Sequence, residues 1–79
     1  MRLTVRLFGD LRRFLPAKQE LLQIDVPEGA TALYMLEKVG INPGDVWMMR
    51  ANLQVIFDDS LLHDGDNIEV FEPVGGGSL

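Results

Sequence analysis

The sequence predicts an α+β fold, in which a mixed sheet of four to five strands carries one main helix packed on one face. Apolar and polar residues alternate near both ends of the chain, as is typical of half-buried strands. Between them lies a single segment with apolar residues at helical spacing. The chain has 79 residues, of which 47% are hydrophobic, so we expect one small domain with a real core.

The first predicted strand spans residues 2–7, where Leu3, Val5 and Leu7 alternate with polar side chains. The same alternation places the next residue, Phe8, on the outward face of the sheet. An outward aromatic side chain at the end of a strand is a candidate contact residue, although single exposed aromatic residues are also common.

Residues 9–10 break the alternation, and residues 11–15 fit a short helical turn before Pro16. A second strand is predicted at about 20–26. Residues 27–29 close this strand as a turn, because proline and glycine interrupt regular structure.

One helix is predicted from Thr31 to about Val39. Thr31 is a suitable N-cap, because its hydroxyl can accept a hydrogen bond from a backbone N–H of the first turn. Leu33, Leu36 and Val39 fall three residues apart on one face. Gly40 stands where a left-handed C-terminal cap is expected.

Three further strands are predicted after the helix. Residues 46–51 and 54–57 pair across a tight turn at 52–53. Residues 67–72 alternate again after a run of turn-forming residues, and this alternation points Phe71 outward.

The predicted order is strand, strand, helix, strand, strand, strand. Two hairpins that flank one helix favour a sheet with the helix on one face. The connection through the helix permits the first and last strands to pair in parallel in the middle of the sheet. This arrangement is the ubiquitin-like β-grasp, which we assign to residues 1–74, followed by a flexible glycine tail at 75–79.

The formal net charge is −5, and it is unevenly distributed. Five of the seven basic residues lie in the first 18 positions, whereas eleven of the twelve acidic residues follow from Glu20 onward. An acidic surface repels phosphates, which disfavours nucleic-acid binding, and it favours a basic protein partner. The excess acid would equally well serve only to keep a small protein soluble.

The composition also limits the chemistry of the chain. It contains no cysteine, which excludes disulfides, thiolate metal sites and a cysteine nucleophile. No apolar run approaches the length of a membrane span, and the N-terminal residues lack the apolar stretch of a signal peptide. We therefore expect a cytoplasmic protein with no metal and no membrane partner.

Other polar and aromatic residues are weak site candidates. His63 stands alone in a turn and is expected to be solvated. The aspartates of residues 58–66 lack the spacing of a calcium loop and are expected to form turns. Residues 47–49 (WMM) fit core and strand edge better than a cofactor site, and Arg12 and Arg13 fit a solvated patch.

The most informative segment is the end of the chain, where Pro73 and Val74 precede Gly75, Gly76 and Gly77. Glycines lack side chains and adopt both signs of φ, so such a tail can enter a channel too narrow for other residues. On composition alone, the segment could also be a flexible end with no chemistry.

Residues 5–12 (VRLFGDLR) and 62–77 (LHDGDNIEVFEPVGGG) are the most distinctive stretches of the chain. The second combines an Asp-Gly-Asp turn, a last strand, Pro-Val, a small residue and two glycines. Together they resemble the opening strand and the C-terminal signature of the small subunit of molybdopterin synthase. The chain is therefore similar to MoaD/ThiS-like sulfur carriers, and more so to the molybdopterin branch than to the thiamine carriers.

This resemblance implies a sulfur carrier that is a co-substrate and not an enzyme. An activating enzyme would use ATP to adenylate the terminal glycine carboxylate, and sulfur would then convert it to a thiocarboxylate. A sulfur-accepting enzyme, such as the large subunit of molybdopterin synthase, would receive the tail. The carrier itself would bind no cofactor and would be a monomer when alone.

The resemblance also implies which residues act. The three glycines match the family's terminal positions, with Gly77 as the reactive end. An exposed apolar surface would bind the partners, and its residues would be Phe8, Phe71, Pro73 and Val74.

Two features depart from the family pattern. Ser78 and Leu79 follow the glycines, so we expect a protease of the JAMM metalloprotease type to remove them before Gly77 is activated. Leu53 follows Asn52 where the family commonly has glycine, and we expect a changed turn geometry there.

Other functions fit the same sequence. The chain could be a ubiquitin-like binding module that forms no covalent bond, or a protein modifier joined through its glycine tail to lysines of other proteins. As a carrier, it could also deliver sulfur to thiazole, tRNA or an amino acid.

Overall fold

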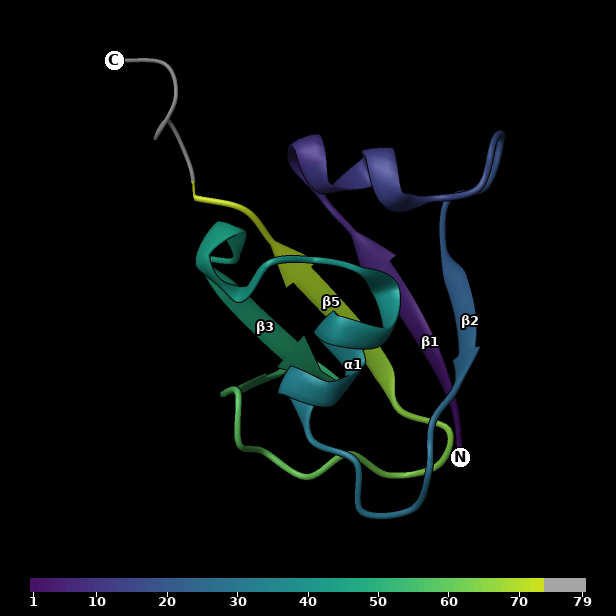
Figure 1. Cartoon of the computed structure of the whole chain (residues 1–79), viewed down its shortest axis with the longest axis vertical. Helices are drawn as coiled ribbons and strands as arrows, with labels where there is room; N and C mark the ends of the chain where they lie inside the picture. Colours follow the sequence, from purple (N-terminus) through teal and green to yellow (C-terminus); the bar gives the residue numbers. More distant parts are fainter. Residues whose placement is uncertain (74–79) are drawn as a thin grey trace.

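The computed structural model describes residues 1–73 and contains a five-stranded sheet with one α-helix (Figure 1). In chain order the elements are β1 (Arg2–Leu7), the 3-10 helix η1 (Gly9–Phe14), β2 (Leu22–Asp25), α1 (Ala32–Val39), the 3-10 helix η2 (Pro43–Asp45), β3 (Met48–Ala51), β4 (Gln54–Ile56) and β5 (Asn67–Phe71). Residues 74–79, which include the predicted glycine tail, lie outside the described residues, so the predicted domain limits stay a prediction. Within residues 1–73, no helix is long and apolar enough to cross a membrane.

The strands lie in the order β2-β1-β5-β3-β4. β1 and β5 run parallel, with Val5 opposite Ile68, whereas the other described neighbours are antiparallel. α1 lies across one face of this sheet (Figure 1). The prediction of a β-grasp with the first and last strands paired inside a mixed sheet is therefore confirmed.

The core lies between α1 and the sheet. Leu3, Val5, Ile68 and Val70 of the parallel pair have no exposed surface, as their alternation with polar residues predicted. Burial of apolar surface is the main force that holds such a layer together. The parallel pair is therefore a well-packed part of the core, and Glu72 and Pro73 follow directly from it.

The buried face of the helix agrees only in part with the predicted one, since Leu36 is at its centre but Leu33 and Val39 lie at its border. Met35 and Leu36 are fully buried and so is Ala32, whereas Leu33 and Val39 are only half-buried. An α-helix turns about 100° per residue, so the residues that share a stripe are spaced i, i+3, i+4 and i+7. Residues spaced strictly three apart, as Leu33, Leu36 and Val39 are, rotate progressively out of that stripe.

Both predicted helix ends are confirmed. Thr31 Oγ1 accepts a hydrogen bond from the N–H of Tyr34 at 3.2 Å. Gly40 has a φ of 96°, and its N–H donates to the C=O of Leu36 at 2.9 Å. The positive φ is the reason for glycine at this cap.

The β3–β4 hairpin differs from expectation at its turn. Asn52 and Leu53 both have positive φ, 52° and 71°, as in the two-residue turn that Asn-Gly commonly makes. The expected change of turn geometry is therefore wrong, because Leu53 adopts the left-handed conformation in place of glycine. β3 begins at Met48, later than predicted, because η2 occupies residues 43–45 and leaves only two residues before the strand.

Candidate partner-docking site

The two aromatic residues predicted to bind partners lie together. Phe8 follows β1 and Phe71 ends β5, and the parallel pairing brings these two strand ends to the same edge of the sheet. Their rings stack with centroids 4.7 Å apart and planes at 9°. Phe8 is 37% exposed, so the stack is open to a partner. We call this pair the aromatic stack.

A charged row lies beside the aromatic stack, on the sheet face opposite the buried side chains. In the strand register Glu69 stands between Arg6 of β1 and Arg50 of β3. Arg50 Nη2 is 2.8 Å from Glu69 Oε1, and the guanidinium carbon of Arg50 lies 5.2 Å from the ring centroid of Phe71. The aromatic stack thus borders a cation that is 32% exposed and already paired with Glu69.

Arg50 is a site residue that sequence reasoning missed. The alternation in β5 places Glu69 and Phe71 on one face, and a similar pattern in β3 would have given the face of Arg50. The contact between them depends on the register of β3 against β5, which no short-range pattern reveals.

The chain leaves the sheet at Glu72 and Pro73, and Pro73 is exposed. The side chain of Glu72 lies over Gly9, where an added Cβ would collide with the Glu72 carboxylate. Gly9 also has a φ of 66°, a left-handed conformation that favours glycine, and any larger residue there would in addition have to displace the Glu72 side chain. The remaining predicted site residues, Val74, Gly75, Gly76 and Gly77, lie outside the described residues, and their roles stay predictions.

A buried carboxylate holds the turn before β5. Asp66 is 7% exposed and accepts hydrogen bonds from the N–H of His63 at 2.8 Å and from Nδ2 of Asn52 at 2.9 Å. The side chain of His63 is 80% exposed, in agreement with its predicted solvation. Asp66 therefore acts as the predicted turn former and also ties the β3–β4 turn to the last strand.

Two basic residues of η1 lie on the surface, as predicted. Arg12 and Arg13 are both exposed. Arg13 Nη1 donates to the C=O of Asp10 at 2.8 Å, and its guanidinium carbon lies 4.7 Å from the ring centroid of Phe14. Arg13 thus binds within its own helix, and a solvated patch describes the pair well.

The perturbed ionisable groups lie at the other end of β1. Arg2 and Asp25 face each other on β1 and β2 and form an ion pair at 3.2 Å. The hydrogen bond and the charge of Arg2 hold the pKa of Asp25 below its ordinary value, and the same contact raises the pKa of Arg2. Within residues 1–73, no three His, Cys, Asp or Glu side chains lie close enough together to hold a metal ion.

The sequence profile of the ThiS family matches residues 5–77. This match includes both strands of the parallel pair and ends at the third glycine of the tail. No curated protein matches the chain by sequence.

Solved structures match over nearly the whole chain. SAMP1 from Haloferax volcanii is 23% identical with a TM-score of 0.74, over 98% of this chain and all of that one, and shows the fold. A protein described as molybdopterin converting factor subunit 1 from Pyrococcus furiosus is 26% identical with a TM-score of 0.72, over 92% of this chain and 98% of that one. A chain in the complex of subunits 1 and 2 of the molybdopterin-converting factor from Helicobacter pylori is 26% identical with a TM-score of 0.62, over 98% and 100% of the two chains.

The family match and the structural matches agree with the resemblance of the two sequence segments. The prediction that the chain is not an enzyme is confirmed through the family, whose members are small sulfur carrier proteins. The chain belongs to the ThiS family of MoaD/ThiS-like sulfur carriers.

Proposed function

We propose that this chain carries sulfur as a thiocarboxylate on Gly77, formed after Ser78 and Leu79 are removed, and that it does so in the cytoplasm for molybdopterin synthesis. The observation that carries the proposal is the extent of the family match, which reaches Gly77 and leaves out the last two residues. The similarity to a molybdopterin converting factor subunit 1 supports the pathway.

The proposed chemistry proceeds in three steps on the tail. Hydrolysis of the peptide bond between Gly77 and Ser78 consumes one water and frees a glycine carboxylate. This carboxylate attacks the α-phosphorus of ATP and releases pyrophosphate, because a free carboxylate is too poor an electrophile for sulfur to attack. Hydrosulfide then attacks the carbonyl carbon of the acyl adenylate, AMP leaves, and a thiocarboxylate remains.

The body of the carrier supplies docking and reach. Five extended residues from Pro73 to Gly77 span at most about 17 Å, which allows the reacting carbon to enter a partner's active site while the body stays outside. The aromatic stack lies two residues before Pro73, so a partner that binds the stack receives the tail beside it. Arg50 would add a charged contact at the same surface.

Two partners follow from this scheme. One is an activating enzyme that binds ATP, and the other is a sulfur-accepting enzyme such as a large subunit of molybdopterin synthase. The Helicobacter pylori structure, a complex of subunits 1 and 2, supports the second. The carrier alone is proposed to be a monomer that binds no cofactor.

Intact-mass measurement tests the proposal. The full chain and a chain ending at Gly77 are each incubated with the activating enzyme, ATP and sulfide. The chain ending at Gly77 should gain the mass of one sulfur in place of one oxygen, and the full chain should not. A thiocarboxylate on the full chain would overturn the trimming step, and no sulfur on the shorter chain would overturn the carrier function.

The same trimmed terminus would also suit a protein modifier. SAMP1 shares the fold, and an activated Gly77 could be attacked by a lysine amine in place of hydrosulfide. Blots for an epitope-tagged chain in its native cells distinguish the two. A ladder of higher-mass conjugates that disappears when Gly77 is deleted would establish modification, and its absence would leave sulfur delivery as the function of the tail.

A further inference from the structure

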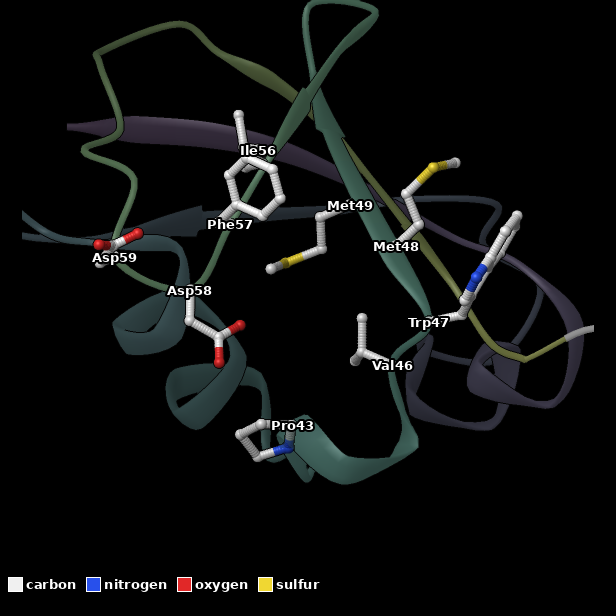
Figure 2. Close-up of a pocket in the computed structure, with 9 residues that line it drawn as sticks. All are labelled: Pro43, Val46, Trp47, Met48, Met49, Ile56, Phe57, Asp58 and Asp59. Atoms are coloured by element: carbon white, nitrogen blue, oxygen red, sulfur yellow. The ribbon is translucent and has the colours of Figure 1, made fainter.

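We propose that a second docking surface lies at the corner formed by η2, β3 and the end of β4, and that it binds a basic, apolar segment of a partner protein. This surface, the corner groove, encloses about 410 Å³ (Figure 2). The inference concerns the body of the protein and not the tail, so it stands whether or not Gly77 carries sulfur.

The floor of the corner groove is apolar. Met49 and Ile56 face each other across β3 and β4, and Val46 precedes β3 on the same side. Figure 2 shows the side chains of Met49 and Val46 pointing into the space between Phe57 and Pro43. Met49 is buried, whereas Ile56 and Val46 are half-buried, so the floor retains apolar surface that an incoming side chain can cover.

Exposed aromatic side chains flank this floor. Trp47 is 59% exposed and Phe57 is 67% exposed, and both line the groove. Scattered apolar residues are normal on a surface, but large ones gathered around one groove mark an interaction site.

Two carboxylates at the rim determine the charge of the partner. Asp58 and Asp59 are exposed, and within residues 1–73 neither side chain makes a hydrogen bond or an ion pair. Figure 2 shows the Asp58 carboxylate pointing into the groove. The formal net charge of −5 strengthens attraction of a cation and repels acidic segments. The groove therefore fits an apolar side chain next to a lysine or arginine.

The open shape of the groove favours a protein segment over a small ligand. Its volume falls within the range of small-molecule pockets, about 300–1,000 Å³, but such pockets bury most of the ligand and this groove does not close over it. The edge of β4 can also pair with a segment. The N–H of Asn52 donates to the C=O of Asn67. Backbone groups alternate in direction along a strand, so the even-numbered residues of β3 bond to β5 and its odd-numbered residues bond to β4. By this alternation, the main chain of Val55 faces the free edge.

The corner groove adjoins the aromatic stack at the start of β3, although the groove floor lies on the helix-facing side of the sheet and the stack on the other side. Met48, which lines the groove, lies opposite Phe71 in the register, and the N–H of Trp47 donates to the C=O of Phe71 at 2.8 Å. A partner seated on the aromatic stack can therefore extend a segment into the groove. The two contacts would together fix the orientation of the body on its partner.

Two capped pentapeptides test the charge preference. Ac-Leu-Arg-Leu-Arg-Leu-NH2 and its counterpart with glutamates in place of the arginines are titrated into the full chain. Trp47 is the only tryptophan, so its emission reports binding at the groove directly. The arginine peptide should give a saturable change, with amide shifts confined to residues 43–59, and the glutamate peptide should give none. Equal responses to both, no saturable response, or shifts that map elsewhere would overturn the proposal.

Charge-matched variants localise the effect. Asp58→Asn/Asp59→Asn should weaken binding of the arginine peptide about fivefold, since exposed ion pairs are individually weak and two are removed together. Glu20→Gln/Glu28→Gln makes the same change in net charge near β2, at the opposite edge of the sheet, and should have little effect. Equal weakening by both variants would show only a general attraction and would overturn the site.

Two further measurements distinguish binding at the corner groove from the chemistry of the tail and from self-association. Deleting residues 75–79 should leave peptide binding unchanged, so a failed sulfur assay and a failed binding assay remain distinct. Sedimentation without peptide should show a monomer whose Trp47 emission is independent of protein concentration. A dimer with concentration-dependent emission would make a second copy the occupant and would overturn the assignment to a basic partner.

Discussion

Single residues around the β3–β4 turn fix the part of the fold that leads to the last strand. Leu53 has a positive φ, which strains its backbone, and its side chain is 75% exposed. Packing of the leucine side chain therefore offsets little of this strain. The left-handed conformation costs an L-residue about 1–2 kcal/mol. Asp66, by contrast, stabilises this part of the fold, because its buried carboxylate accepts hydrogen bonds from residues of two different turns.

Leu53→Gly should raise the free energy of unfolding by about 0.5–1 kcal/mol, because glycine removes the strain but adds entropy to the unfolded chain. Urea denaturation measures the change. Leu53→Ala keeps the strained conformation and should show no comparable gain. A lower stability for the glycine variant would mean that the exposed leucine packs in solution.

Asp66→Ala should lower the free energy of unfolding by about 1–3 kcal/mol, because it removes the two hydrogen bonds that the Asp66 carboxylate accepts from the N–H of His63 and from Nδ2 of Asn52. Chemical denaturation at neutral pH checks this value. Asp59→Ala removes an exposed carboxylate without a partner in residues 1–73 and serves as the control. Similar effects of both changes would contradict the role of Asp66.

At the scale of elements, the parallel pairing of β1 with β5 is the decisive feature. It brings Phe8 and Phe71 together although they lie at opposite ends of the chain. It also sets the turn at Gly9 directly under the Glu72 side chain. The same strand pair thus forms the aromatic stack and carries Glu72 and Pro73, the residues that precede the predicted tail.

Phe8→Ala should weaken binding to the activating enzyme about tenfold or more, as expected for an aromatic anchor at an interface. Calorimetric titration gives the Kd. Leu61 is 61% exposed and lies beside Thr31, away from the stack, so Leu61→Ala should leave the Kd unchanged. Equal loss in both variants would argue against the aromatic stack as the docking surface.

Gly9→Ala should be more destabilising than Gly29→Ala. Both positions have positive φ, but an added Cβ meets the Glu72 side chain at Gly9 and nothing within 4 Å at Gly29. Thermal unfolding of the two variants isolates the contact. Adding Glu72→Ala to Gly9→Ala should recover part of the difference, and no recovery would show that backbone strain alone is responsible.

At the scale of the whole molecule, the fold was predictable because its signals are local. Alternation marked the strands, and Thr31 and Gly40 marked the helix ends. The pairing of the first and last strands followed from the order of the elements, but the register of β3 against β5 was not predictable, as Arg50 beside Phe71 shows. Trp47 was expected in core or strand edge, yet it precedes β3 and is 59% exposed, because η2 displaces the start of that strand.

A chain ending at Gly76 should lose sulfur transfer completely and keep its affinity for the activating enzyme. Docking depends on the body, whereas the chemistry needs the carboxylate at one position of the partner's active site. Thiocarboxylate detection and calorimetric titration on the same samples check both halves. Transfer that persists would mean that Gly77 is not the required terminus.

The pairing of β1 with β5 has a consequence for the time at which the protein becomes active. Val5 cannot meet Ile68 until nearly all of the described chain has left the ribosome, and such distant contacts form slowly. The aromatic stack does not exist before that pairing. Under the proposed function, an incomplete or misfolded chain would therefore lack the docking surface for an activating enzyme, and ATP would be used only on completely folded carriers.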